Sequence, residues 1–342
     1  MSGAQPFGVL ALGTEVQRIT LRAGALTAHI LTLGATLQDL RLAGTPWSLT
    51  LGADLLAAYS GPMRWFGAIV GPVANRLAGA SADIAGHTAR FEANEGANTL
   101  HSGAGGTSDQ VWQIEAQASD HVTLRLALPD GLGGFPGNRV VRAEYRIIAP
   151  ATLRLTLTAQ SDAATLMNLA HHPYWNLDGQ GDARAQNLAV VAETYLPTDP
   201  QNLPQTPPRP LSGSPRDLRQ GAPLALVARL DHCFCLAAAL RPMTQVARLR
   251  GTKGVTMTLS TTAPGLQVYD GAGIDTAPYP GLMGTPYGPF AGIALEPQFW
   301  PDAPRRPDFP SILLEPDTPW QQVTEYRFSR TDLAGDSAAV GC

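Results

Sequence analysis

Charged residues are scarce in this sequence. Only 15% of its 342 residues are Asp, Glu, Lys or Arg, against the roughly 25% that is typical of soluble domains, whereas 44% are hydrophobic. The formal net charge is −4, and the cations are scattered along the chain instead of forming a basic stripe. This composition predicts a globular protein with a large core, and it argues against a nucleic-acid partner.

Cysteine and long apolar runs are also rare. Three cysteines, Cys233, Cys235 and Cys342, cannot form an even disulfide framework, and no second Cys or His pair completes a metal site around the first two. No stretch approaches the roughly 18 apolar residues of a membrane span, and residues 1–10 lack the pattern of a signal peptide. We therefore expect a cytoplasmic protein without a membrane partner, in which Cys233 and Cys235 are small buried hydrophobic residues.

Alternation of hydrophobic and polar residues is the clearest regular pattern. It runs through 122–128, 141–147 and 153–157, with turn signals between the three segments, and it returns at 255–259 and near 326–328. Alternation places one side of a strand on a core and the other in solvent. The first three segments predict an antiparallel meander.

Helical spacing and internal repeats are largely missing. One short amphipathic stretch lies around 54–59, and no period of 20 to 50 residues indicates a propeller or solenoid. The 35 glycines and 29 prolines punctuate many loops. The Pro-rich segment 197–215 could link two halves or form a long surface excursion of one sandwich. Because the strands on both sides have matching polarity, we favour one large all-β sandwich.

Histidine is scarce as well, and it is the side chain that titrates near neutral pH without help. Among seven histidines, His101 lies in a loop-like segment, and His171 and His172 precede an aromatic and amide-rich run that could line a pocket for a polar ring. Alternatively, one of the pair is structural and the other exposed. Adjacent strand residues point to opposite faces, so these two are poorly placed to bind one metal ion together.

Two carboxylates, Glu296 and Asp231, lie among apolar neighbours. Such surroundings raise the pKa of a carboxyl group toward the range useful for a general base. The alternative is a buried carboxylate that backbone donors cap or that an arginine such as Arg76 neutralises. Trp175 and Trp300 could be core residues or platforms for a sugar ring.

Several segments in the first half of the chain resemble the aldose 1-epimerase, or galactose mutarotase, family. Gly-Pro-Val-Ala-Asn-Arg-Leu at 71–77 resembles the family's glycine-to-Ala-Asn-Arg segment. Asn-Thr-Leu-His-Ser-Gly at 98–103 resembles its Leu-His-Gly-Gly loop, and residues 130–138 resemble its Gly-aromatic-Pro-Gly turn. Pro72 and Ser102 depart from the family pattern and are expected to adjust loop shape.

The resemblance continues through the second half, in family order. Residues 168–177 are similar to the family's Asn-His-x-Tyr-Phe-Asn-Leu stretch, 230–234 to its Asp-His-x-Phe, and 267–269 to its Gln-x-Tyr strand. Residues 295–311 are similar to its Leu-Glu-x-Gln…Pro-Asp-Ala tail. His171 stands where the family has Asn, but the Tyr-aromatic-Asn-Leu register that follows places His172 at the position of the catalytic histidine.

The resemblance implies a fold, an activity and a set of site residues. The fold is one antiparallel β-sandwich domain over 1–342, the galactose mutarotase-like supersandwich. The activity is interconversion of the α and β anomers of a free aldose such as galactose or glucose, without metal or cofactor, by a monomer or homodimer. Glu296 would be the general base, His172 the general acid, as imidazolium at neutral pH, and His101 a second hydrogen-bonding histidine. The residues that would orient sugar hydroxyls are Asn75, Arg76, Asp231 and Gln267.

Three other functions remain open from the sequence. A glycosidase could use Glu296 and Asp231 as paired carboxylates, although His172 would then have no role. A sugar sensor could retain the fold without catalysis. A mutarotase for sugar phosphates would need an arginine cluster at the pocket, and Arg305-Arg306 is the one obvious doublet, for which exposed loop charge is the simpler explanation.

Overall fold

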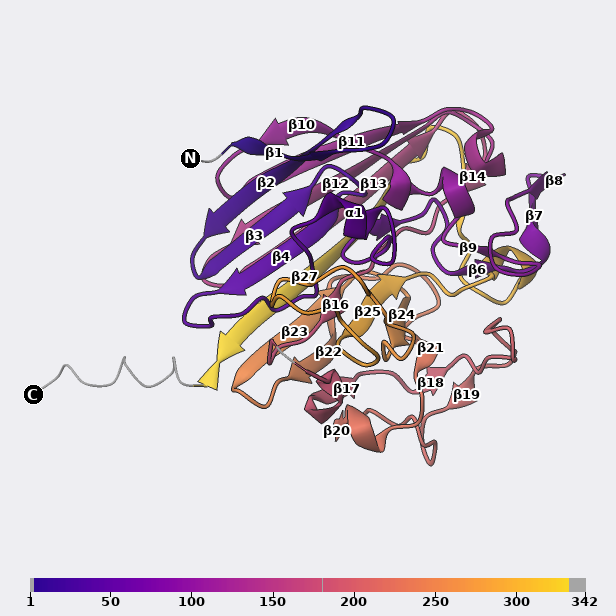
Figure 1. Cartoon of the computed structure of the whole chain (residues 1–342). Helices are drawn as coiled ribbons and strands as arrows, with labels where there is room; N and C mark the ends of the chain where they lie inside the picture. The colour runs from indigo at the N-terminus through magenta and orange to yellow at the C-terminus, as the bar shows by residue number, and fades with distance from the viewer. Residues whose placement is uncertain (1–2, 180, 332–342) are drawn as a thin grey trace, which may run out of the picture.

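The structure is a computed structural model that describes residues 3–179 and 181–331, and it consists mainly of β-strands (Figure 1). Three sheets account for most of it, and the paired strands within each are antiparallel. The first sheet contains, in spatial order, β1 (Ala4–Val9), β2 (Glu15–Ala23), β3 (Leu26–Leu31) and β4 (Thr36–Leu42).

The second sheet has nine strands among the described residues. In spatial order they are β10 (Gln113–Gln117), β11 (His121–Leu128), β12 (Arg139–Ile148), β13 (Thr152–Ser161), β27 (Trp320–Arg330), β23 (Val255–Thr261), β22 (Thr244–Arg250), β17 (Asn187–Val190) and β20 (Ala222–Pro223). Strand β27, the last of the described strands and yellow in Figure 1, thus lies between β13 and β23 and joins the two halves of this sheet.

The third sheet carries most of the residues discussed below. In spatial order it contains β16 (Tyr174–Trp175), β25 (Ile293–Gln298), β24 (Gly265–Tyr269), β21 (Asp231–Cys235), β18 (Thr194–Tyr195) and β19 (Arg209–Pro210). The Pro-rich segment 197–215 follows β18 and contains β19. Because β19 pairs with β18, the chain between them leaves this sheet as a loop and returns to it.

Short elements complete the fold. The two-stranded pairs are β5 (Ile69–Val70) with β15 (Ala170–His171), β6 (Arg76–Leu77) with β9 (Thr99–Leu100), β7 (Ser81–Ile84) with β8 (His87–Arg90), and β14 (Thr165–Leu166) with β26 (Leu313–Leu314). Helix α1 (Leu56–Tyr59) is a single turn. Short 3₁₀ turns occur at Ala78–Ala80, Gly103–Gly105, Thr107–Asp109, Leu132–Gly134, Ala183–Ala185, Leu224–Leu226 and Ala303–Arg305.

The hydrophobic core lies on one face of the nine-stranded sheet. Along β12 every second side chain is buried, as the alternation predicts. The four-stranded sheet packs on this face through β2, which contacts β11 and β12. The six-stranded sheet packs on it through Trp175, whose ring centroid lies 4.8 Å from that of Tyr326 on β27. Apolar side chains of all three sheets form one continuous cluster, so the core is that of a sandwich.

The fold predicted from alternation is confirmed. The segments at 122–128, 141–147 and 153–157 lie in β11, β12 and β13, which form the expected meander. The segment expected to be helical at 54–59 is helical over only its last four residues. Cys233 is buried, as expected, whereas Cys235 is only half-buried; both are unpaired, and Cys342 lies outside the described residues. In the part of the chain that the structure describes, no helix is long and apolar enough to cross a bilayer.

Candidate active site

A deep cleft opens over one face of the six-stranded sheet. Strand register places Gln267 opposite Glu296 and Asp231 opposite Tyr269. Opposed residues of antiparallel strands share a face, and the alternation brings every second residue back to it. Tyr174 pairs with Ala294, two residues before Glu296, and joins the same face. These five side chains line the cleft, and the residues between them face the core.

Two neighbouring loop segments supply the opposite wall of the cleft. Arg76 on β6 pairs with Leu100 on β9, so Asn75 and His101, which adjoin these short strands, lie side by side. Both residues have left-handed backbone conformations, with φ of 63° and 50°. This conformation is uncommon for residues other than glycine and is maintained only by strong local contacts.

The backbones of Asn75 and His101 provide those contacts and fix the state of the His101 ring. The His101 N–H donates to the Asn75 carbonyl at 3.0 Å, and the Asn75 N–H donates to His101 Nδ1 at 3.2 Å. Since Nδ1 accepts this hydrogen bond, the ring hydrogen of a neutral His101 is on Nε2. Burial lowers the pKa of His101 well below 6.5, and His172, Arg76 and Arg64 add to this effect. His101 is therefore a neutral donor at physiological pH.

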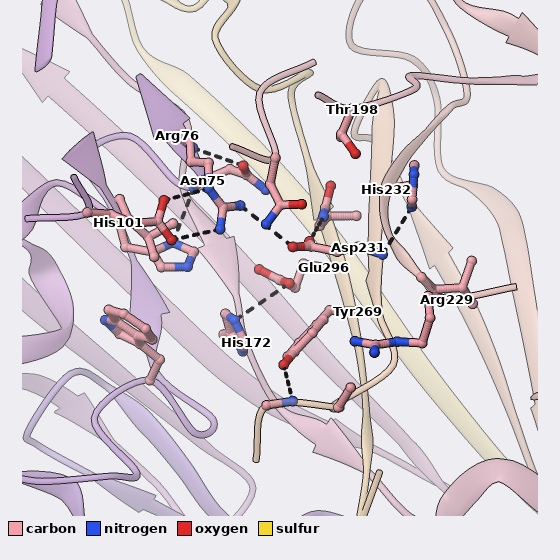
Figure 2. A pocket seen from close by; sticks show the side chains of 18 of the residues that line it. Asn75, Arg76, His101, His172, Thr198, Arg229, Asp231, His232, Tyr269 and Glu296 are labelled. Carbon is pink, nitrogen blue, oxygen red and sulfur yellow. Dashed lines mark hydrogen bonds and ion pairs between the residues drawn. The ribbon is translucent and has the colours of Figure 1, made fainter. Parts of the chain in front are cut away.

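His172 and Glu296 meet at the bottom of the cleft (Figure 2). The distance from His172 Nε2 to Glu296 Oε1 is 3.6 Å, and the two residues are only 4% and 2% exposed. Gly67 holds the His172 backbone by donating its N–H to the His172 carbonyl at 2.9 Å. Gly67 has φ of +71°, and a Cβ here would lie 2.2 Å from the Leu37 carbonyl oxygen, so glycine is required.

Burial shifts the protonation of this pair away from the charged forms. It lowers the pKa of His172 to about 4. It raises the pKa of Glu296 well above 4.5, and nearby Asp231 raises it further while Arg76 lowers it. Glu296 Oε2 and His172 Nδ1 are buried and have no partner among the described residues. Buried polar atoms without partners are rare in folded proteins, so these two indicate a place for ligand or water hydroxyls.

A chain of polar contacts runs along the cleft beside this pair. Arg76 donates from Nε and Nη2 to the two carboxylate oxygens of Glu95 at 2.6 and 2.8 Å, and its Nη1 lies 3.7 Å from Asp231 Oδ2. Gln267 donates to Asp231 Oδ1 at 2.6 Å. Burial raises the pKa of Asp231, whereas Arg76 and Gln267 lower it. The chain fixes the orientation of a guanidinium, a carboxylate and an amide, which together can bind several hydroxyl groups.

The structure brings all seven residues singled out by the sequence into this one cleft: Asn75, Arg76, His101, His172, Asp231, Gln267 and Glu296. His171 points the other way and packs between Tyr145 and Tyr326, whose hydroxyl lies 3.1 Å from His171 Nδ1. Burial lowers the pKa of His171 to about 3. The adjacent histidines thus lie on opposite sides of the chain, and neither is exposed.

Two tryptophans and an arginine doublet that the sequence offered as possible site residues lie outside the cleft. Trp175 is a core residue, and Trp300 packs on Phe309; neither lines the cleft. The Arg305-Arg306 doublet also lies outside the cleft. Arg305 binds the Ala78 carbonyl and Ser81, and Arg306 lies near Asp302, so the doublet has a structural role.

The sequence reasoning missed several residues that line the cleft. Glu95 precedes the His101 loop, and its pairing with Arg76 depends on a contact between separate strands. Trp65 packs against the His101 ring, with 5.0 Å between ring centroids. Thr198, Asn202 and Gln205 bring part of the Pro-rich segment over the cleft. No sequence pattern marks these residues, because side-chain contacts between distant segments create their positions.

The cleft has a volume of about 830 Å³, within the range of roughly 300–1,000 Å³ found for small-molecule sites. It contains a buried acid-base pair, groups for binding hydroxyls, and aromatic walls from Trp65, Tyr174 and Tyr269. These features define a β-sandwich enzyme that can move protons on a polar, ring-shaped substrate.

Comparisons with known proteins identify the family. A family model for aldose 1-epimerase matches residues 17–327. The chain is 31% identical to galactose mutarotase from Bos taurus over 94% of its length and 97% of that protein. It is 31% identical to aldose 1-epimerase from Escherichia coli (strain K12), covering 92% and 96% of the two chains. The chain belongs to the aldose 1-epimerase family and is accordingly an isomerase of the mutarotase type.

Solved structures agree with this assignment. An aldose epimerase homologue from C. elegans superposes with a TM-score of 0.87 at 25% identity, covering 92% of this chain and 99% of that one. A galactose 1-epimerase from Lactobacillus acidophilus superposes with a TM-score of 0.82 at 25% identity, covering 96% and 98%. The predicted sandwich of the galactose mutarotase type is therefore confirmed.

Proposed function

We propose that this protein interconverts the α and β anomers of a free aldose such as glucose or galactose, with Glu296 as general base and His172 as general acid. The observation that carries this proposal is the close approach of these two buried side chains, 3.6 Å apart at the bottom of a cleft lined with hydroxyl-binding groups. His101 would donate a further hydrogen bond to the sugar, and Asn75, Arg76, Asp231 and Gln267 would orient its hydroxyls.

Anomerisation requires two proton movements. Glu296 takes the proton of the anomeric hydroxyl while His172 gives a proton to the ring oxygen, and the bond between C1 and the ring oxygen breaks. The resulting aldehyde rotates about the C1–C2 bond, and the ring oxygen adds to its other face. As the ring closes, His172 takes its proton back from the ring oxygen and Glu296 returns its proton to the C1 oxygen, so that each turnover restores both groups.

The active enzyme has one proton shared between Glu296 and His172, and either residue can carry it. The low pKa of His172 and the raised pKa of Glu296 put this proton on Glu296 in the empty cleft. The expectation that His172 is an imidazolium at neutral pH is therefore wrong for the free enzyme. A sugar hydroxyl that donates to Glu296 Oε2 would favour the carboxylate and thereby move the proton to His172.

We predict a broad pH profile for kcat/KM. Below a pH of about 4, both groups are protonated and no base remains. On the alkaline side, activity is lost when the last proton leaves, at a pH above the ordinary value of 4.5 for Glu296. Polarimetry between pH 3.5 and 9, after subtraction of the uncatalysed rate, measures both limbs. A narrow optimum between pH 4.5 and pH 6.5, the ordinary pKa values of the two groups, would show that burial does not shift the pKa of either Glu296 or His172.

Loss of Arg76 should weaken substrate orientation. Its charge-assisted hydrogen bonds are each worth about 1.5–3 kcal/mol, so we expect Arg76→Ala to lower kcat/KM by about 10- to 150-fold. Arg248→Ala, on an exposed position of β22 outside the cleft, is the matched control. Steady-state mutarotation of α-D-glucose and α-D-galactose measures the effect, and full activity of Arg76→Ala would contradict the proposed role.

Polarimetry of freshly dissolved α-D-glucose and α-D-galactose tests the proposed function as a whole. Acceleration by the wild-type protein supports it. Binding of either sugar without acceleration would instead favour a sugar sensor. Cleavage of nitrophenyl glycosides without anomer exchange would favour a glycosidase using Glu296 and Asp231.

A further inference from the structure

The cleft is larger than a single pyranose ring requires. Its volume of about 830 Å³ is in the upper part of the range for drug-sized ligands. The residues proposed to bind the aldose lie at one end, on the sheet face and the Asn75–His101 wall. Part of the remaining lining comes from β18, the Pro-rich segment, the residues between that segment and β21, and β21 itself. We call this part the outer cleft, and it consists of Tyr195, Thr198, Gln205, Arg209, Arg216, Arg229 and His232.

The two parts of the cleft differ in charge. The inner part contains three carboxylates, Glu95, Asp231 and Glu296, and one cation, Arg76. The outer cleft contains three arginines, and the one carboxylate at its rim among the described residues is Asp275. Since the whole chain has a formal charge of −4, this local excess of cations is not a property of the surface in general.

Arg216 is held in place with part of its guanidinium unused. Its Nε donates to the Arg229 carbonyl at 3.2 Å, and its guanidinium lies over the Tyr195 ring, 5.9 Å from the centroid. Within residues 3–179 and 181–331, neither Arg216 nor Arg209 has a carboxylate in ion-pair range. Arg229, by contrast, is paired with Asp270 at 2.7 Å. A fixed guanidinium with free N–H groups is suited to binding a carboxylate or phosphate.

His232 adds a neutral donor to the outer cleft, and Figure 2 shows it on the same side of the site as Arg229. The Asp231 N–H donates to His232 Nδ1 at 3.1 Å, so the ring hydrogen of the neutral form is on Nε2. Burial, helped by Arg216, lowers the pKa of His232 to about 4. Its ring also packs edge-on against Tyr195, with 5.7 Å between centroids. The same strand therefore presents Asp231 to the inner cleft and an N–H donor to the outer cleft.

We infer that the outer cleft binds an anionic substituent, a phosphate or a carboxylate, carried by the aldose whose anomeric centre lies between His172 and Glu296. The inference rests on the proposed function and specifies its substrate class. A neutral aldose offers no charged group to these arginines, whereas an anionic substituent would be bound by Arg209 and Arg216 and oriented by His232.

Anomer exchange at equilibrium, measured by NMR exchange spectroscopy, tests this inference. The substrates are glucose, glucose 6-phosphate, glucuronate and maltose, at low and at high salt. We expect kcat/KM for at least one of the two anionic sugars to exceed that for glucose by about tenfold or more at low salt, and the preference to shrink at high salt. A higher kcat/KM for glucose 6-phosphate would identify phosphate as the bound group, and a higher kcat/KM for glucuronate would identify carboxylate.

The double variant Arg209→Gln/Arg216→Gln should bring the ratio of anionic to neutral kcat/KM close to one. Its matched control is Arg248→Gln/Arg250→Gln, which removes the same charge from exposed positions of β22 and should preserve the ratio. Equal kcat/KM for glucose and both anionic sugars, or a preference for maltose, would overturn the inference while leaving the proposed function intact. No exchange with any of these four sugars, or with galactose tested in the same way, would overturn both the inference and the proposed function.

Discussion

Glu296→Gln is expected to reduce the rate of mutarotation by about 10²- to 10⁴-fold, which is the usual contribution of a general base. The amide has nearly the same shape as the carboxyl group but cannot take the proton of the anomeric hydroxyl. Glu296 is only 2% exposed, so bulk solvent has little access to the position of its carboxyl group. Polarimetry of α-D-galactose measures the loss. The matched control is Glu193→Gln, since the Glu193 side chain is 83% exposed and lies outside the cleft.

The Glu296→Gln variant should be more stable than the wild type at neutral and alkaline pH. The folded-state pKa of Glu296 is raised above 4.5, so the folded state holds this proton more tightly than the unfolded state. Wild-type stability is therefore lost as the pH rises from about 4.5 through the folded-state pKa, and the variant lacks this loss. Calorimetry between pH 5 and 8 should show a Tm difference that grows with pH. A variant that is inactive because it is unfolded would instead show no cooperative unfolding transition.

His172→Ala should lower turnover by a similar factor of about 10²- to 10⁴-fold, because the ring oxygen then loses its proton donor. The neighbouring His171→Ala is an informative comparison, since His171 packs between Tyr145 and Tyr326, away from the cleft. That variant should reduce Tm through the loss of buried contacts while the remaining folded protein turns over sugar.

Chemical rescue separates the acid role of His172 from a structural one. The alanine variant leaves space beside Glu296 that free imidazole can enter, so added imidazole should restore part of the rate of His172→Ala and none of the loss in Glu296→Gln. If folded His171→Ala loses as much turnover as folded His172→Ala, the assignment of the acid to His172 is wrong.

Much of the architecture follows from local sequence patterns. Alternation alone predicts the meander of β11, β12 and β13, because each strand buries one face and the turn residues between them are visible in the sequence. The choice of His172 over His171 rests instead on the resemblance, because the Tyr-aromatic-Asn-Leu register that follows matches the family motif. Alternation explains only why the two adjacent histidines lie on opposite sides of the chain.

Other properties of the site depend on the assembled structure. The protonation of His172 depends on how completely the assembled lining of the cleft excludes water, which no single segment reveals. The arginines of the outer cleft are separated along the chain, so they form no doublet, whereas the visible doublet Arg305-Arg306 lies elsewhere. Glu95 is recognised only through its contact with Arg76, which requires β6 and β9 to pair first.

The wide separation of the site residues along the chain, from Asn75 to Glu296, has a consequence for folding. Strand β27, which follows all other described strands along the chain, lies in the middle of the nine-stranded sheet and supports the sheet that carries Glu296. Contacts between such distant segments form slowly because long loops must close first. The recovery of catalysis after dilution from denaturant should therefore lag behind the recovery of β-structure, and enzymatic turnover should report the final step of refolding.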